Sequence, residues 1–228
     1  MISHCIFFVT AYTTASIAEW FFHKHCMHNS EKDLPGRVLQ GLNKRHVIHH
    51  SVTNPDMTVR NSKSKYEEKG LQTYMHLEEF DGLYFLWPPT ITMWIIGMVG
   101  GPMINKTLNI VLSPVDFISY DDVSHRFSVG VGFFLASWIT IIWNWLHPQL
   151  HKARRLSISE GLDIIPRWEW MKDTFFYNYL WKHHVLHHFV SQGNFNVTLP
   201  GADWLFNTNY TECKRYKIDM KNKIVYKL

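Results

Sequence analysis

The chain has 228 residues, enough for one domain with a sizeable core, and a formal net charge of +4. Its three cysteines, Cys5, Cys26 and Cys213, are too few and too scattered for a disulfide framework or a thiolate metal site, so we expect reduced thiols. The sequence has no nucleic-acid-binding motif, so its modest positive charge favours a basic membrane-facing surface over a nucleic-acid partner.

The first apolar stretch, residues 2–18, contains no Asp, Glu, Lys or Arg. About twenty apolar residues span a bilayer core, so this stretch is only just long enough to cross. A signal peptide is disfavoured, because the stretch lacks a basic start and a small-residue cleavage site and runs directly into Glu19 and a histidine block. We therefore expect a helix that enters the membrane.

Two histidine blocks follow this stretch. The sequence HKHCMH contains His23 and His28, spaced H-x4-H, and the sequence HVIHH contains His46, His49 and His50. On a helix, positions i, i+3 and i+4 share one face, so the spacing predicts that the three imidazoles of the second block converge on one point.

The second apolar stretch, residues 82–105, is long enough to cross a bilayer. Pro88 and Pro89 lie near its start, and proline breaks or kinks a helix. The element therefore begins after them, near Thr90, or folds back as a hairpin with residues 108–118. The sequence leaves both arrangements open.

The third stretch, residues 127–146, is also of membrane-spanning length, and it leads into HPQLH, where His147 and His151 are spaced H-x3-H. A residue before proline avoids the helical region, so we expect His147 to end the membrane helix and Pro148 to open a new one at its first position. The long segment that follows, residues 152–173, is a candidate cover for a substrate entrance.

The last block, WKHHVLHH, repeats the H-x-x-H-H pattern with His184, His187 and His188. Random placement of the 15 histidines predicts about 0.06 copies of this pattern, and the chain has two. Crowded imidazoles among apolar residues are costly without an organiser, and neutral imidazole is the commonest protein ligand for transition metals. The blocks therefore predict a metal site, and a histidine-rich structural surface is the alternative.

Loop charges indicate the orientation of the chain. Residues 23–69 hold nine Lys or Arg and residues 214–228 hold six, whereas the loop 106–126 holds two. Two apolar stretches separate the early blocks from the late ones, so both sets lie on one side, which the positive-inside rule makes cytoplasmic. The predicted fold class is all-α: about three to four membrane helices under a cytosolic histidine-rich helical cap, as a single domain over residues 1–228.

The order of these blocks resembles the fatty acid hydroxylase superfamily, which includes sterol desaturases, sphingolipid and carotenoid hydroxylases and fatty acid 2-hydroxylases. The resemblance runs over about residues 19–208. EWFFHKHCMH is similar to the first block of the family, and KHHVLHHFVSQGNFNVT followed by ADWLFNT is similar to the last. The doubled histidines of HHVLHH and the WPP after the second block lean toward the 2-hydroxylase branch, whereas the length of residues 152–173 departs from it.

The resemblance implies a membrane-embedded monooxygenase that uses O2 and two iron ions, with zinc an option in isolated protein, to hydroxylate a fatty acyl or sphingolipid chain. It implies the endoplasmic reticulum for a eukaryotic chain. An external donor, cytochrome b5-like or ferredoxin-like, is expected because the chain has no Rossmann, flavin or His-Pro-Gly-Gly haem motif. The metal ligands that it implies are His23, His28, His46, His49, His50, His147, His151, His184, His187 and His188.

Two roles are open for each of the carboxylates Glu19 and Asp203. Glu19 lies one helical turn before His23, where it would orient that imidazole or serve as an ordinary helix-end carboxylate. Asp203 would hydrogen-bond a ligand or cap a turn.

The remaining histidines lie off the pattern. His25 and His183 are expected in supporting or structural roles, and His4 as a buried or interfacial residue of the first apolar stretch. His76 and His125 are expected at the surface.

Three other functions stay open. A sterol or carotenoid hydroxylase or desaturase of the same superfamily differs in substrate shape, which histidine spacing does not report. A membrane acyl-CoA desaturase also uses histidine blocks, but the H-x3-H block and the segment after His188 favour the hydroxylases. A metal-handling membrane protein, such as a zinc or iron transporter, would place ligands along a path inside its spanning helices, whereas these blocks lie at or beyond the ends of the apolar stretches.

Overall fold

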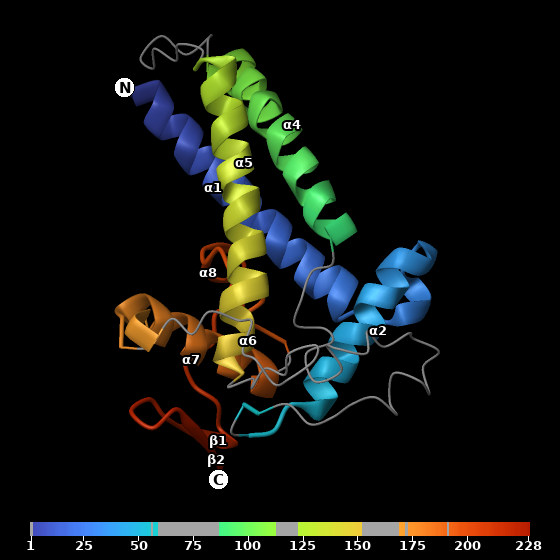
Figure 1. Cartoon of the computed structure of the whole chain (residues 1–228), viewed down its shortest axis with the longest axis vertical. Helices are drawn as coiled ribbons and strands as arrows, with labels where there is room; N and C mark the ends of the chain where they lie inside the picture. Colours follow the sequence, from blue (N-terminus) through green and yellow to red (C-terminus); the bar gives the residue numbers. More distant parts are fainter. Residues whose placement is uncertain are drawn as a thin grey trace, which may run out of the picture.

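In the computed structural model, three long helices form a stalk, and the other elements form a cap at one end of it (Figure 1). The structure describes residues 2–55, 57–58, 87–112, 123–151, 169–171, 173–190 and 192–228. The stalk helices are α1 (Ile2–Phe22), α4 (Trp87–Leu112) and α5 (His125–Ile141). The N-terminus lies at the far end of the stalk and the C-terminus lies in the cap.

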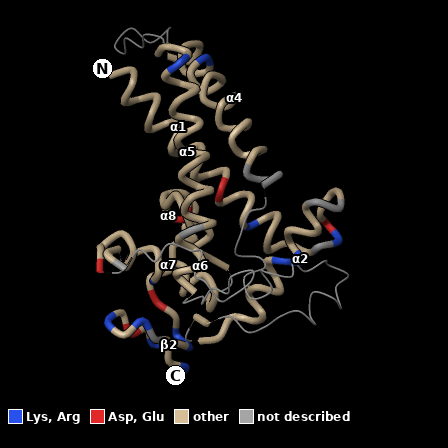
Figure 2. The backbone as a smooth tube through the Cα atoms, viewed as in Figure 1, with Lys and Arg blue, Asp and Glu red and all other residues tan. Residues whose placement is uncertain are grey.

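Each stalk helix belongs to a segment long and apolar enough to cross a membrane, namely Ile2–Met27, Ile91–Leu112 and His125–Leu150. Large apolar side chains face outward along the stalk, as at Ile96 and Phe134. Lys and Arg instead gather in the cap and at the far end of the stalk (Figure 2). Exposed apolar surface of this extent is rare in soluble monomers, so the fold indicates a membrane protein with three spanning helices in its described part.

Small residues let α4 and α5 approach closely. A Cβ atom added at Gly97 would overlap the carbonyl oxygen of Gly132, and one added at Gly101 would overlap that of Ser128. The GxxxG spacing on α4 is a packing motif of membrane helices, where close backbone contact replaces the hydrophobic effect. Phe7 of α1 is fully buried in the apolar cluster that α1 shares with α5.

Proline begins α4 rather than breaking it. The helix starts at Trp87, so Pro88 and Pro89 fall in its first turn, where a missing N–H has no helical partner to lose. The helix then continues to Leu112. The predicted start near Thr90 is therefore a few residues late, and the alternative of a hairpin with residues 108–118 is wrong as far as the described residues extend.

The cap elements surround the ends of α1 and α5. Two π-helical turns, His23–Met27 and Ile142–Leu146, continue these helices into the cap. The other cap elements are the short 3-10 helices Glu31–Asp33 and Glu169–Met171 and the α-helices α2 (Gly36–Val52), α6 (His147–Leu150), α7 (Phe175–Val190) and α8 (Ala202–Leu205).

A C-terminal hairpin departs from the all-α expectation. Strand β1 (Tyr216–Asp219) pairs antiparallel with β2 (Ile224–Lys227). Val225 of the hairpin is buried in the same cluster as Trp181 of α7, so the hairpin is part of the cap core. The fold is therefore mostly helical with one small sheet, and the signals for it are the alternating apolar and polar residues of β1 and the β-branched pair Ile224 and Val225 of β2.

Candidate metal centre

Histidines from four parts of the chain converge in the cap. Among the described residues, two groups of four present ligand atoms that all lie within 4.8 Å of one another. The first group is His23, His28, His46 and His187, and the second is His49, His147, His151 and His184.

The two remaining predicted ligands extend these groups. The Nε2 atom of His50 lies 3.0 Å from Nε2 of both His46 and His187, and Nε2 of His188 lies 3.2 Å from Nε2 of His184. We therefore add His50 to the first group and His188 to the second, and call these sets of five the first and second clusters. The rings of His50 and His188 stack with their centroids 4.1 Å apart, so the clusters are in direct contact.

Each H-x-x-H-H block is divided between the two clusters. In α2, His46 and His50 belong to the first cluster and His49 belongs to the second. The reason is helical geometry. Adjacent residues such as His49 and His50 differ by about 100° around the helix axis, so one ring points into the second cluster and the other into the first. In α7 the division is reversed: His184 and His188 belong to the second cluster and His187 belongs to the first. The prediction that each triad converges on one point is therefore wrong.

A π-helical turn explains the H-x4-H spacing. On an α-helix, a residue five positions along lies about 140° away around the axis, so His23 and His28 would point in different directions. The turn His23–Met27 is a π-helix, whose i→i+5 hydrogen bonds widen the turn and so bring the two residues toward one side. Their ring centroids are 5.1 Å apart.

The second π-helical turn leads directly into His147. We predicted that Pro148 would keep His147 out of the helical region, but its φ of −54° and ψ of −45° are helical. His147 is fully buried, and its Nε2 lies 2.9 Å from Nε2 of His184. The helix continues from His125 to Leu150, so the expectation that His147 ends the membrane helix is wrong, although Pro148 does lie in the first turn of α6.

Hydrogen bonds to carbonyl oxygens fix the tautomers in the first cluster. Nδ1 of His23 donates to the carbonyl oxygen of Phe195 at 2.6 Å, and Nδ1 of His187 donates to that of Gly193 at 3.0 Å. Since a neutral ring has one N–H, both Nε2 atoms direct lone pairs into the cluster. A metal ion fits this arrangement, because metal-bound histidines usually donate their other N–H to a carbonyl or carboxylate.

The second cluster contains buried nitrogens that lack partners. His49 is fully buried, and within the described part of the chain neither of its ring nitrogens has a hydrogen-bond partner. A buried polar atom left unsatisfied costs about 1–3 kcal/mol. Because the Nε2 atoms of His151 and His184 are also only 2.7 Å apart, an ion at their centre would satisfy several nitrogens at once.

Burial sets the protonation of these histidines. It lowers the pKa of His28 to about 4. Burial, and after it the charges of neighbouring histidines, lowers the pKa well below the ordinary value in His46, His49, His50, His151, His184, His187 and His188. These rings are therefore neutral at pH 7, the form that binds a metal. Two clusters made of imidazole alone suit iron, zinc or copper better than calcium or magnesium.

Glu19 does not contact His23. Its carboxylate accepts hydrogen bonds from the backbone N–H of Thr198 at 2.8 Å and of Leu199 at 2.9 Å, and from Nδ2 of Asn196 at 3.3 Å. It therefore ties α1 to the segment 196–199 and affects His23 only through that segment.

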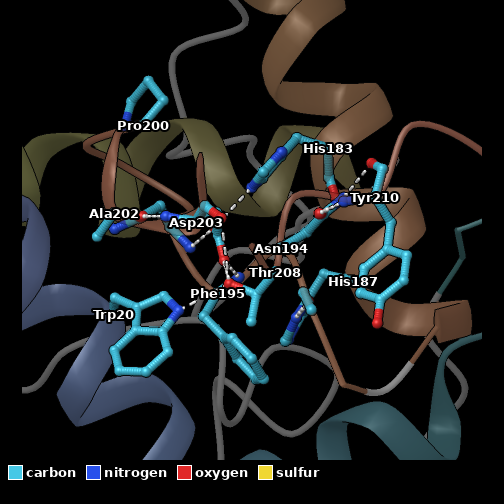
Figure 3. Close-up of polar contacts among 12 residues, drawn as sticks. Trp20, His183, His187, Asn194, Phe195, Pro200, Ala202, Asp203, Thr208 and Tyr210 are labelled. Carbon is cyan, nitrogen blue, oxygen red and sulfur yellow. Dashed lines mark hydrogen bonds and ion pairs between the residues drawn. The ribbon is translucent and has the colours of Figure 1, made fainter. Parts of the chain in front are cut away.

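Asp203 supports the same segment from the other side (Figure 3). Its carboxylate accepts from the backbone N–H groups of Phe195 and Asn196 at 3.0 and 2.7 Å, from Oγ1 of Thr208 at 2.6 Å and from Nε2 of His183 at 3.1 Å. Burial by itself raises the pKa of this carboxyl, but the bonds from His183, Thr208 and Asn196 bring it below its ordinary value. Asp203 thus caps a turn and holds an off-pattern histidine.

Sequence reasoning missed two asparagines that position the ligands. Nδ2 of Asn43 donates to the carbonyl oxygens of Met27 and Asn29, both at 2.9 Å, which joins α2 to the turn that carries the first block. Asn194 adopts a φ of 56° and exchanges side-chain hydrogen bonds with the backbone of Tyr210. The signal for Asn43 is its place three residues before His46, on the ligand-bearing face of α2.

The off-pattern histidines lie outside both clusters. His183 is held by Asp203, as expected for a supporting residue, and His25 contacts the rings of Trp20 and Phe21. His4 and His125 are exposed. His76 and residues 152–168 lie outside the described residues.

No protein-family profile, curated protein or solved structure matches this chain. The geometry and chemistry of the two clusters therefore carry the functional argument.

Proposed function

We propose that the protein is a membrane oxygenase that uses two iron ions and O2 to hydroxylate a C–H bond of a fatty acyl or sphingolipid chain. The observation that carries the proposal is the pair of touching, buried clusters of histidine at the end of a membrane-spanning stalk. The order of histidine blocks, which resembles the fatty acid hydroxylase superfamily, agrees with it.

Ten imidazole nitrogens exceed what one octahedral ion accepts, and they are divided five and five. Two iron ions bound there would supply the reaction with O2 that removes hydrogen from an unactivated C–H bond, which no side chain performs. The chain's own groups hold the geometry: the carbonyl oxygens of Phe195 and Gly193 orient two rings of the first cluster. Trp143 and Phe195 are buried beside His23 and exclude water from it.

The place of the clusters supports a lipid substrate. They lie where the stalk enters the cap, so a hydrocarbon chain would reach them from the bilayer without crossing water. A transporter would instead hold its ligands along a path within the spans. Here the described ligands gather at one end of the stalk.

Such a reaction consumes two electrons, which an external donor, cytochrome b5-like or ferredoxin-like, would supply from the cytosol. Figure 2 places Lys and Arg along the cap, and those that are exposed, such as Lys214, Arg215 and Lys217, would form a suitable surface for an acidic protein. Purified protein should therefore oxidise lipid only when a donor and its reductase are added, and turnover with NADPH alone would contradict this requirement.

The test of function is lipid mass spectrometry in a lipid-producing host that expresses the protein. A gain of one oxygen in an acyl or sphingolipid chain is the expected result for the wild type, and His187→Ala should abolish it. His125→Ala is the matched control, because His125 is exposed and remote from both clusters. A loss of two hydrogens would instead identify a desaturase, and an unchanged lipid profile with active donor and bound iron would refute the proposal.

A further inference from the structure

Helix α8 lies where the stalk meets the cap (Figure 1), and it carries two large apolar side chains that are exposed. Trp204 and Leu205 are each 63% exposed, whereas the preceding Ala202 and Asp203 are buried. Helix α8 packs against α1. Helix α1 belongs to the segment Ile2–Met27, which is apolar enough to cross a membrane. Tryptophan favours the boundary between the hydrocarbon core and the headgroups, so α8 fits the membrane interface.

A groove runs between α1 and α8. Tyr12, Thr13 and Ser16 line it from α1, and Gly201, Trp204 and Leu205 line it from the other side. Its volume of about 440 Å³ falls within the range of about 300–1,000 Å³ of known ligand pockets.

Two hydroxyl groups of the groove, those of Tyr12 and Ser16, already bond to the protein backbone. The Tyr12 hydroxyl donates to the carbonyl oxygen of Pro200 at 2.6 Å. Oγ of Ser16 donates to the carbonyl oxygen of Leu199 at 2.7 Å and accepts from the backbone N–H of Ala202 at 2.9 Å. These two hydroxyl donors are therefore used within the protein, and the remaining lining is mostly apolar, which favours an apolar ligand.

The inner wall of the groove adjoins the first cluster. Ala202 packs in one apolar cluster with Trp20 and Phe195. The ring centroid of Phe195 lies 5.5 Å from that of His28 and 5.8 Å from that of His187, and Figure 3 shows the Phe195 ring between Trp20 and His187. One layer of aromatic side chains thus separates the groove from predicted metal ligands.

We propose that this groove binds a single hydrocarbon chain of a bilayer lipid, which enters sideways from the membrane with α8 as the interfacial edge. A lipid of the bilayer is the expected ligand, because the groove is lined by a helix apolar enough to span the membrane and its walls are mostly apolar. The identification of the bound chain as the substrate rests on the proposed function, but chain binding itself requires neither metal nor turnover.

The experiment uses the full-length protein in phosphatidylcholine vesicles that contain a lipid with a photoreactive acyl chain. Cross-linked residues are mapped by mass spectrometry. We expect labels in residues 12–16 and 201–205 in excess of those on the outward face of α4. Thr13→Trp fills the groove and should lower this labelling several-fold, whereas Thr14→Trp, an exposed neighbour outside the groove, should not.

A second pair covers the opposite wall in case Thr13→Trp fails to fold. Leu205→Trp should lower the labelling and Phe206→Trp, which is exposed but does not line the groove, should not. The proposal would be overturned if each groove variant were labelled as strongly as its control variant. It would also be overturned if the wild type were labelled no more in the groove than on α4. If the groove variants lose labelling while no form of the protein oxidises lipid, the groove is a lipid site and the proposed function is wrong.

Discussion

At the scale of single residues, two rings of the first cluster are held by the backbone, whereas both ring nitrogens of His49 in the second cluster lack a hydrogen-bond partner among the described residues. His23 and His187 are fixed by carbonyl oxygens from the segment 193–195, which Glu19 and Asp203 support through the following residues. His49 has no such partner in the described part of the chain. A metal ion bound in the second cluster would give this ring a partner.

His49→Ala should therefore remove the metal of the second cluster and abolish lipid oxidation. We expect bound metal to fall from about two ions per chain to about one, because the first cluster keeps all five of its imidazoles. Metal analysis of purified variants measures this. His25→Ala is the control, since His25 belongs to neither cluster and its ring contacts those of Trp20 and Phe21. Equal metal loss in both variants would show that the clusters were assigned wrongly.

The lowered pKa values of the cap histidines predict how stability depends on pH. An unfolded chain takes up protons on histidine below a pKa of about 6.5, whereas the folded metal-free protein resists protonation down to the lowered values, about 4 for His28. The free energy of unfolding of metal-free protein should therefore fall as the pH drops from about 7 to about 5.

Thermal unfolding of chelator-treated protein in detergent across this pH range tests the sign. Metal-loaded protein at the same pH values is the control, because bound metal keeps the imidazoles unprotonated and stabilises the folded state. Metal-free stability that stays constant or rises toward pH 5 would contradict the burial of neutral histidines.

At the scale of elements, sequence patterns predicted the helices better than their details. The charge-free stretches identified α1, α4 and α5, because a length of apolar residues is a direct requirement of the bilayer. The π-helical turns were not predictable from α-helical periodicity. The first of them, His23–Met27, is what brings the two histidines of the H-x4-H block onto one side. The division of each H-x-x-H-H block depends on the facing helix, which local sequence does not specify.

The close packing of α4 against α5 can be tested with two adjacent glycines of α4, because Gly101 faces α5 and Gly100 does not. Gly101→Ala places a Cβ atom against the carbonyl oxygen of Ser128, so it should destabilise the stalk by about 1–3 kcal/mol. Gly100→Ala meets no atom within 4 Å and should leave stability unchanged or slightly raised. Unfolding of both variants in detergent measures the difference, and equal stability would argue against close packing of these helices.

At the scale of the whole molecule, the fold joins the two ends of the chain around the histidines. Residues 23–50 supply half of the clustered histidines and residues 147–188 supply the other half. The ten histidines that the spacing of the blocks and the family resemblance predicted as ligands all lie in the two clusters. Their supports, such as the Phe195 carbonyl oxygen and Asn43, were not predictable, because any residue offers a carbonyl and only the fold determines which one faces a ring.

The measurement that tests the central claim most directly is the metal content of purified, folded wild-type protein reconstituted with iron. Five imidazoles in each of two touching clusters predict about two ions per chain, both removed by a chelator and both restored by added iron. One ion per chain, or none, in protein shown to be folded would contradict the two-metal centre.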